Sequence, residues 1–160
     1  MGRIVYQKNS KGVTMGELVF NSQLNKEVDE LYRSLAESIV EQGVEAEIPI
    51  EHFTYAGLYV RTCRLPKGSL IVGAMIQIPT VVIVSGNCVV SAGLFTQDII
   101  GNNIVIKGLS NRRQIFLARE DSSITMIFRT DNTDLRECEK EFTPEWKLLT
   151  TNRSDLVCQV

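Results

Sequence analysis

The sequence predicts an all-β protein with one helix. Between residues 57 and 130, short runs of β-favouring residues alternate with turns that contain glycine, and no helical period interrupts them. One stretch, residues 21–43, repeats its apolar residues at the helical period. Many short strands joined by tight turns are typical of a small antiparallel barrel. We therefore expect one barrel with a helix ahead of it.

The composition is that of one globular domain. The chain has 160 residues, of which 44% are apolar and 22% charged, and these values exclude disorder along the whole chain. No apolar run reaches the roughly 18 residues that span a bilayer, and residues 1–17 lack the pattern of a signal peptide. We expect a cytoplasmic protein that has no membrane partner.

Four cysteines lie far apart in the sequence, at Cys63, Cys88, Cys138 and Cys158. A chain with this apolar content needs no disulfide framework, so we expect reduced thiols. Cys63 and Cys88 fall within strand patterns, where a thiol packs as a small apolar side chain.

The first region, residues 1–56, is expected to contain the helix. Asn21 or Ser22 can cap the start of the helix, and Gly43 can end it. Its apolar stripe follows steps of three and four residues and consists of Leu24, Val28, Leu31, Leu35 and Ile39. The stripe must be buried, either on the chain's own barrel or on a partner subunit. We predict a homo-oligomer in which this helix takes part.

The barrel is expected over residues 57–130, and its first strand shows a two-residue alternation. Its faces hold Leu58, Val60 and Thr62 on one side, and Tyr59, Arg61 and Cys63 on the other. Pro66-Lys67-Gly68 predicts a turn, because Pro presets φ and Gly tolerates positive φ. The next strand is expected over residues 69–78, with Gly73 at a bulge or a close approach.

Two hairpins are predicted in the middle of the barrel. The first would turn at Ser85-Gly86-Asn87 and the second at Gly101-Asn102-Asn103, since apolar runs flank both segments. Residues 114–118 and 124–128 would be the closing strands, joined by a turn at Glu120-Asp121.

The last region, residues 131–160, is predicted to be an acidic tail. Pro144 breaks any long helix, while Trp146 and Leu148-Leu149 provide an apolar anchor. Because tryptophan is rarely left in water, we expect this segment to pack on the barrel or on a partner. Trp146 joins residues 21–43 in the predicted oligomer interface.

Several short motifs follow one another in a fixed order. They are Gly57-Leu58-Tyr59-Val60-Arg61, Leu65-Pro66-Lys67-Gly68-Ser69, Gly73, Val84-Ser85-Gly86, Arg112-Arg113, Arg119-Glu120-Asp121 and Phe128-Arg129-Thr130. In order and spacing they resemble the cupins, in particular the small single-domain cupin-like proteins that bacteriophages encode. The resemblance covers under half of the chain. It implies a double-stranded β-helix, a jelly-roll barrel that is open at one end and binds ligands inside.

Cupins that are enzymes hold a metal through histidines that follow the glycine of the first motif. In this chain Gln77 and Thr80 stand where the resemblance places histidines. The one histidine, His52, precedes the barrel, and we interpret it as a surface or linker residue. Glutamine and threonine are poor ligands for zinc, iron or manganese beside imidazole and carboxylate. We therefore expect no metal, no cofactor and no catalytic residue.

Arginines are the candidates for ligand binding. The barrel region holds eight basic and three acidic residues, whereas the flanking regions hold nine basic and sixteen acidic residues. Arginine suits bidentate recognition of phosphate or carboxylate. Arg61 is either an inward charge that requires an anion or an outward residue in solvent. The predicted ligand-binding residues are Tyr59, Arg61, Gln77, Arg112, Arg113 and Arg119.

The resulting functional hypothesis is a non-catalytic binding protein of the cupin fold. The resemblance suggests a phage accessory or anti-defence protein that binds an anionic small molecule, such as a signalling nucleotide, or a host protein. The alternatives are a metal-independent cupin enzyme similar to sugar-nucleotide isomerases, and a structural protein of a virion. Nucleic acid is not expected as a partner, because the net charge is −2 and the pI is about 5.5.

Overall fold

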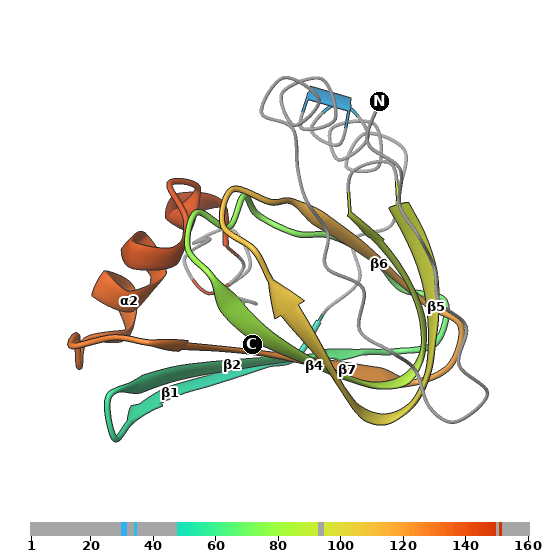
Figure 1. Cartoon of the computed structure of the whole chain (residues 1–160), viewed down its shortest axis with the longest axis horizontal. Coiled ribbons are helices and arrows are strands. Elements are labelled where there is room, and N and C mark those ends of the chain that lie inside the picture. Colours follow the sequence, from blue (N-terminus) through green and yellow to red (C-terminus); the bar gives the residue numbers. More distant parts are fainter. Residues whose placement is uncertain (1–29, 32–33, 35–47, 93–94, 150, 152–160) are drawn as a thin grey trace, which may run out of the picture.

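The structure is a computed structural model that describes residues 30–31, 34, 48–92, 95–149 and 151. Strands dominate it, in agreement with the predicted all-β class (Figure 1). The strands are β1 (Ile50–Tyr55), β2 (Leu58–Leu65), β3 (Leu70–Val72), β4 (Thr80–Ala92), β5 (Phe95–Gly108), β6 (Gln114–Ala118) and β7 (Ser122–Arg129). The helix α2 (Leu135–Phe142) and the 3-10 turn η1 (Trp146–Leu148) follow.

The strands form one sheet that folds over on itself. Its order is β1-β2-β7-β4-β6-β3, and β5 pairs with β4 along nearly all of its length. The first half of β4, residues 81–85, pairs with β7, and its second half, residues 88–92, pairs with β6 on the same edge. The long β4–β5 pair therefore belongs to both halves of the curled sheet (Figure 1).

The two predicted middle hairpins are instead one long, bent hairpin. Gly86 and Gly101 do not sit in turns but oppose each other within β4 and β5. A Cβ on Gly86 would lie 2.8 Å from the carbonyl oxygen of Asp121, and the φ of Gly86 is 119°, so this close crossing requires glycine. Both glycine segments resemble turns in sequence because turns and bulges alike use positive φ.

A bulge in β5 shifts its register with β4 between the two halves of the hairpin. Between the Val84–Ile104 pair and the Gly86–Gly101 pair, β5 contains one residue more than β4. Asn103 occupies this bulge with a φ of 57°. As a result, Ile104 on one side of the bulge and Ile99 on the other both contribute to the same core.

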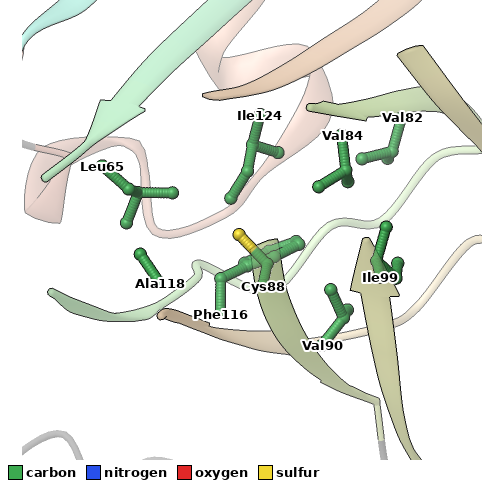
Figure 2. Packing of buried hydrophobic residues seen from close by; sticks show 9 residues of the cluster. All are labelled: Leu65, Val82, Val84, Cys88, Val90, Ile99, Phe116, Ala118 and Ile124. Atoms are coloured by element: carbon green, nitrogen blue, oxygen red, sulfur yellow. The ribbon is translucent and has the colours of Figure 1, made fainter. Parts of the chain in front are cut away.

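The main core lies between the two halves of the sheet. Figure 2 shows its nine buried residues, which are Leu65, Val82, Val84, Cys88, Val90, Ile99, Phe116, Ala118 and Ile124. Cys88 behaves as predicted, as a small buried residue on a strand. The described barrel interior is thus filled by apolar side chains, and its polar groups gather elsewhere.

The chain around the barrel differs from the expected outline. The sheet begins at Ile50, because β1 pairs with β2 over six residues. Residues 135–142 of the expected tail form the helix α2. Of the expected helix at 21–43, only Glu30, Leu31 and Ser34 are described, with helical backbone, and the remainder lies outside the described residues. Within the described part of the chain, no helix is long and apolar enough to cross a bilayer.

Candidate functional site

Helix α2 covers one end of the inner face of β2 and β7. Its sequence places Leu135, Cys138, Glu139 and Phe142 on one stripe, and the last three are buried. Phe142 packs against Tyr59 of β2 in a tilted contact and against Phe128 of β7 edge-to-face, with ring centroids 5.8 Å from each. Asp134 caps the helix by accepting a hydrogen bond from the Glu137 N–H at 3.0 Å. This packing brings the acidic helix onto a strand that carries a buried arginine.

That arginine is Arg61, and its counter-ion is Glu139. The Nη1 of Arg61 donates to Oε1 of Glu139 at 2.9 Å. The two residues are 7% and 1% exposed, so the ion pair is shielded from water. Period-two alternation predicted that Arg61 shares a face with Tyr59, and the burial pattern of β2 agrees. The anion that an inward Arg61 requires is supplied by the chain itself.

His52 and Tyr59 complete the buried polar cluster. The Nδ1 of His52 lies 3.0 Å from the Tyr59 hydroxyl and 3.8 Å from Oε1 of Glu139. Arg61 Nη1 donates to the Tyr59 hydroxyl oxygen at 3.4 Å. With Arg61 donating to the hydroxyl oxygen, the hydroxyl proton is directed to the Nδ1 of His52. The neutral ring of His52 therefore carries its hydrogen on Nε2.

The pKa shifts agree with this arrangement of protons. Burial, helped by Arg61 and opposed by Glu139, lowers the pKa of His52, so the ring is neutral at pH 7. Burial raises the pKa of Tyr59 to about 12, which keeps its hydroxyl protonated. Burial alone would lower the pKa of Arg61, but Tyr59, Cys63 and Glu139 outweigh it and the pKa is raised. The cluster holds one cation, one anion and two neutral groups.

An open pocket of about 370 Å³ borders this cluster at the beginning of α2. Its lining residues are His52, Asp134, Leu135, Arg136, Glu139 and Thr151. The hydroxyl of Thr151 lies within hydrogen-bonding distance of Glu139 Oε1 and 3.4 Å from Arg61 Nη1. Arg136 is exposed, and within the described chain no ion pair or hydrogen bond engages its guanidinium. The pocket thus offers Arg136 and His52 as hydrogen-bond donors, and the carboxylate of Glu139 beneath them is neutralised by Arg61.

The structure brings two of the six predicted ligand residues together, Tyr59 and Arg61. Tyr59 is fully buried against the rings of Phe128 and Phe142, and its hydroxyl is joined to the pocket lining through His52. Gln77 lies at the other end of α2, where its backbone N–H donates to the Phe142 carbonyl at 2.9 Å. Its side-chain Nε2 donates to the Glu141 carbonyl at 3.0 Å.

Arg113 forms a second shielded ion pair, with Glu145 beyond α2. Its Nη1 and Nη2 donate to the two carboxylate oxygens of Glu145 at 2.9 and 2.6 Å. The Met75 N–H donates to the same carboxylate at 3.0 Å. A bidentate pair of this kind fixes both position and orientation. Together with the pair of Arg61, it fastens the segment after β7 to the barrel at two points.

Arg112 and Arg119 lie apart from these pairs. Arg112 is 4% exposed and donates to Gln114, to the Leu109 carbonyl and to Thr80 at 3.0, 2.6 and 2.6 Å. Because these partners are neutral, burial lowers the pKa of Arg112 to about 10. Arg119 forms an exposed ion pair with Asp98 at 3.2 Å. Within the described chain, no contact joins these two residues to the pocket.

Sequence reasoning missed His52, Arg136, Glu139 and Thr151. His52 is not a surface or linker residue: it lies on β1 opposite Arg61, and its side chain is 20% exposed. The alternation of Ile50, His52 and Thr54 was the available signal for this strand. The helical stripe of α2 was the available signal for Glu139. This signal was overlooked because the segment is acidic and Pro144 follows it. Nothing local reveals that Glu139 and Arg61 meet.

No described residues form a cluster of three or more His, Cys, Asp or Glu side chains that could hold a metal ion. Thr80 and Gln77, which stand at the histidine positions of the resemblance, are engaged by Arg112 and by α2. Two acids line the pocket together with His52: Glu139, which pairs with Arg61, and Asp134, which caps α2. The described donor set is therefore suited to hydrogen bonding.

No protein-family model and no curated protein matches the sequence. Several solved structures of low identity show a partial likeness to this chain. A cupin superfamily protein from Desulfitobacterium hafniense is 10% identical, with a TM-score of 0.47 over 56% of this chain and 84% of its own. An RmlC-like cupin from Methanocaldococcus jannaschii is 8% identical, with a TM-score of 0.45 over 54% and 83%. KdgF from Halomonas sp. is 16% identical, with a TM-score of 0.45 over 57% and 87%. At these identities and TM-scores, neither a family nor an activity is transferred to this chain.

Proposed function

We propose that this chain is a non-catalytic binding protein that receives a small anionic ligand in the pocket beside His52. The observation that carries the proposal is the Arg136 guanidinium, which lines the pocket without a partner among the described residues. A carboxylate or phosphate on the ligand would accept hydrogen bonds from Arg136 and from the Nε2–H of His52. The Thr151 hydroxyl, which also lines the pocket, donates its proton to Glu139 and helps to hold that carboxylate in place.

The buried cluster supports this proposal through its charge balance. Glu139 would repel an anion, but its ion pair with Arg61 neutralises it at 2.9 Å. The Asp134 carboxylate is turned to the backbone of α2, where it caps the N–H of Glu137. Tyr59 and Arg61, which the sequence singled out, would therefore act by holding His52 and Glu139 in place. A 370 Å³ pocket falls within the range of small-molecule sites.

The resemblance to phage-encoded cupin-like proteins extends the proposal to an accessory or anti-defence role in the host cytoplasm. In that role the ligand would be a signalling nucleotide, whose phosphates would accept the hydrogen bonds from Arg136 and His52. A host protein with an acidic surface residue is the alternative partner for the same guanidinium. The two are separated by whether free nucleotides bind.

The test is calorimetric titration of the full chain with inorganic phosphate, mononucleotides, cyclic dinucleotides and small dicarboxylates. We expect at least one class to bind below millimolar and Arg136→Ala to weaken binding by about tenfold or more, the value of one charged hydrogen bond. Arg119→Ala is the matched control, because Arg119 is also exposed but pairs with Asp98 away from the pocket. Absence of binding by every class, or equal weakening by both variants, would refute the small-anion proposal.

A further inference from the structure

Among the described residues, strand β1 has an edge that no other strand pairs with. It is the first strand in the sheet order, so one of its edges has no strand partner within the described chain. Half of its backbone N–H and C=O groups point away from β2 and can pair with another strand. Edge strands are usually protected by lysine, proline or a bulge. The sequence of β1, Ile-Glu-His-Phe-Thr-Tyr, has neither residue, and its register with β2 is unbroken.

An apolar row on the outer face leads to this edge. Phe53 of β1 opposes Val60 of β2, which opposes Ile127 of β7, which opposes Val81 of β4. Residues opposite one another in antiparallel strands share a face. Phe53 and Val81 are 53% and 43% exposed, and Tyr55 and Leu58 beside them are 76% and 42% exposed. A continuous apolar surface of this kind marks an interaction site.

The charge pattern of β1 favours a second copy of the same strand in antiparallel orientation. Glu51 is the only charged residue of the strand at pH 7. In a parallel, in-register pair the two Glu51 carboxylates would be adjacent, and their exposed ion pairs with Arg64 of β2 would offset this repulsion only in part. An antiparallel pair centred on Phe53 places each Glu51 opposite Tyr55 of the partner subunit. The carboxylates are then about 14 Å apart, beyond the screening length of about 8–10 Å.

We propose that two chains associate through β1, with Phe53 on the twofold axis and the two sheets joined into one. The apolar row from Phe53 to Val81 then continues across the axis into the same row of the partner. The pairing is isologous, which means that both subunits contribute the same strand, β1. The two paired strands therefore have the same length and sequence. This interface is independent of the pocket and differs from the predicted one at residues 21–43 and Trp146.

The test is disulfide trapping with Phe53→Cys in the full chain that also carries Cys158→Ser. Residues that oppose each other on the axis have Cβ atoms about 4.5–5.5 Å apart, close enough for a disulfide after a small adjustment. We expect oxidation to convert most of this variant into a covalent dimer on a non-reducing gel. Ile100→Cys in the same background is the control, because Ile100 is 67% exposed but lies on β5.

Light scattering on the unmodified chain completes the experiment. The expected mass is that of two 17.9 kDa chains at micromolar concentration. Phe53→Lys, which adds the charge that protects natural edges, is expected to raise the dimer dissociation constant by at least about tenfold while circular dichroism stays unchanged. A monomeric wild-type chain, a dimer unaffected by Phe53→Lys, or equal trapping of the Phe53→Cys and Ile100→Cys variants would overturn the proposal.

Discussion

Arg61 and Glu139, 78 residues apart in the chain, form an ion pair that is almost fully excluded from water. Removing one partner leaves the other as a buried, uncompensated charge. We expect Glu139→Gln to lower the free energy of unfolding by about 3–5 kcal/mol, measured by urea denaturation. The double variant Arg61→Met/Glu139→Leu removes both charges and is expected to recover most of that loss.

The exposed pair of Arg64 and Glu51 provides the control for this prediction. Its atoms are 3.2 Å apart, but the side chains are 58% and 65% exposed. Because solvent screens the charges, such a pair contributes only about 0–1 kcal/mol to the free energy of unfolding. Arg64→Ala should therefore scarcely alter stability. Equal effects of Glu139→Gln and Arg64→Ala would show that burial does not govern the Arg61–Glu139 pair.

Stability should depend on pH through His52, the only histidine in the chain. Burial lowers the pKa of His52 from its usual 6.5, so the unfolded chain takes up a proton at a higher pH than the folded chain. Stability from the neutral ring is fully present above pH 6.5 and is lost as the pH falls through the lowered pKa. We expect urea unfolding free energies to fall from pH 7.5 toward pH 5, and His52→Gln to flatten this dependence.

The tautomer of His52 gives an independent check of the same arrangement. Nitrogen-15 NMR of the single histidine at pH 7.5 should show a protonated Nε2 and an unprotonated Nδ1, as required by the hydrogen bond from Tyr59. Tyr59→Phe removes that donor, so we expect the Nδ1-protonated tautomer of His52 to become populated as well. A protonated Nδ1 in the wild-type chain would contradict the proton order of the cluster.

Gly86 should be intolerant of any side chain. Its φ is 119°, and a Cβ would lie 2.4 Å from the Ser122 hydroxyl oxygen and 2.8 Å from the Asp121 carbonyl. Backbone strain of about 1–2 kcal/mol and overpacking of about 1–3 kcal/mol predict a loss of about 3 kcal/mol for Gly86→Ala. Gly68 has a φ of 82° but no atom within 4 Å of such a Cβ, so Gly68→Ala measures the strain alone. Similar thermal denaturation of both variants would argue against the steric contribution.

The dialysed protein should contain no stoichiometric transition metal. The described residues include no suitable cluster of ligands, and Gln77 and Thr80 are engaged by α2 and by Arg112. Elemental analysis is expected to show far less than one iron, manganese, nickel or zinc per chain. One equivalent that survives dialysis, and whose removal changes the melting temperature, would contradict this prediction.

Local patterns in the sequence predicted local features of the structure. The turn at Pro66-Lys67-Gly68 is present, with the Ser69 N–H donating to the Pro66 carbonyl at 3.0 Å. Gly73 makes the expected close approach, and a Cβ there would lie 3.0 Å from the Gln114 carbonyl. Alternation along β2 placed Tyr59 and Arg61 on one face. Each of these features depends on neighbours within a few residues.

The features that the sequence did not reveal depend on distant partners. Whether Gly86 turns or bends the chain is decided by its crossing with Asp121 and Ser122, not by its neighbours. An inward Arg61 requires an anion, and this requirement could be predicted from the alternation of β2. The identity of the anion could not, because Glu139 lies on a helix that packs against the barrel through Phe142. His52 joins the site only because β1 lies beside β2 in the sheet. Pairwise contacts across the sheet, which one sequence does not display, decided the site.

The additional residue of β5 also determines where this protein can change length. Deleting Asn102 would return β5 to one residue opposite each residue of β4, while Ile99 and Ile104 would keep their sides of the strand. A deletion between Phe95 and Gly108 but outside the bulge at residues 102–103 would turn every residue beyond it to the opposite face of the sheet. The bulge is therefore the point in β5 where evolution could remove a residue and retain the core, at the cost of straightening the bend.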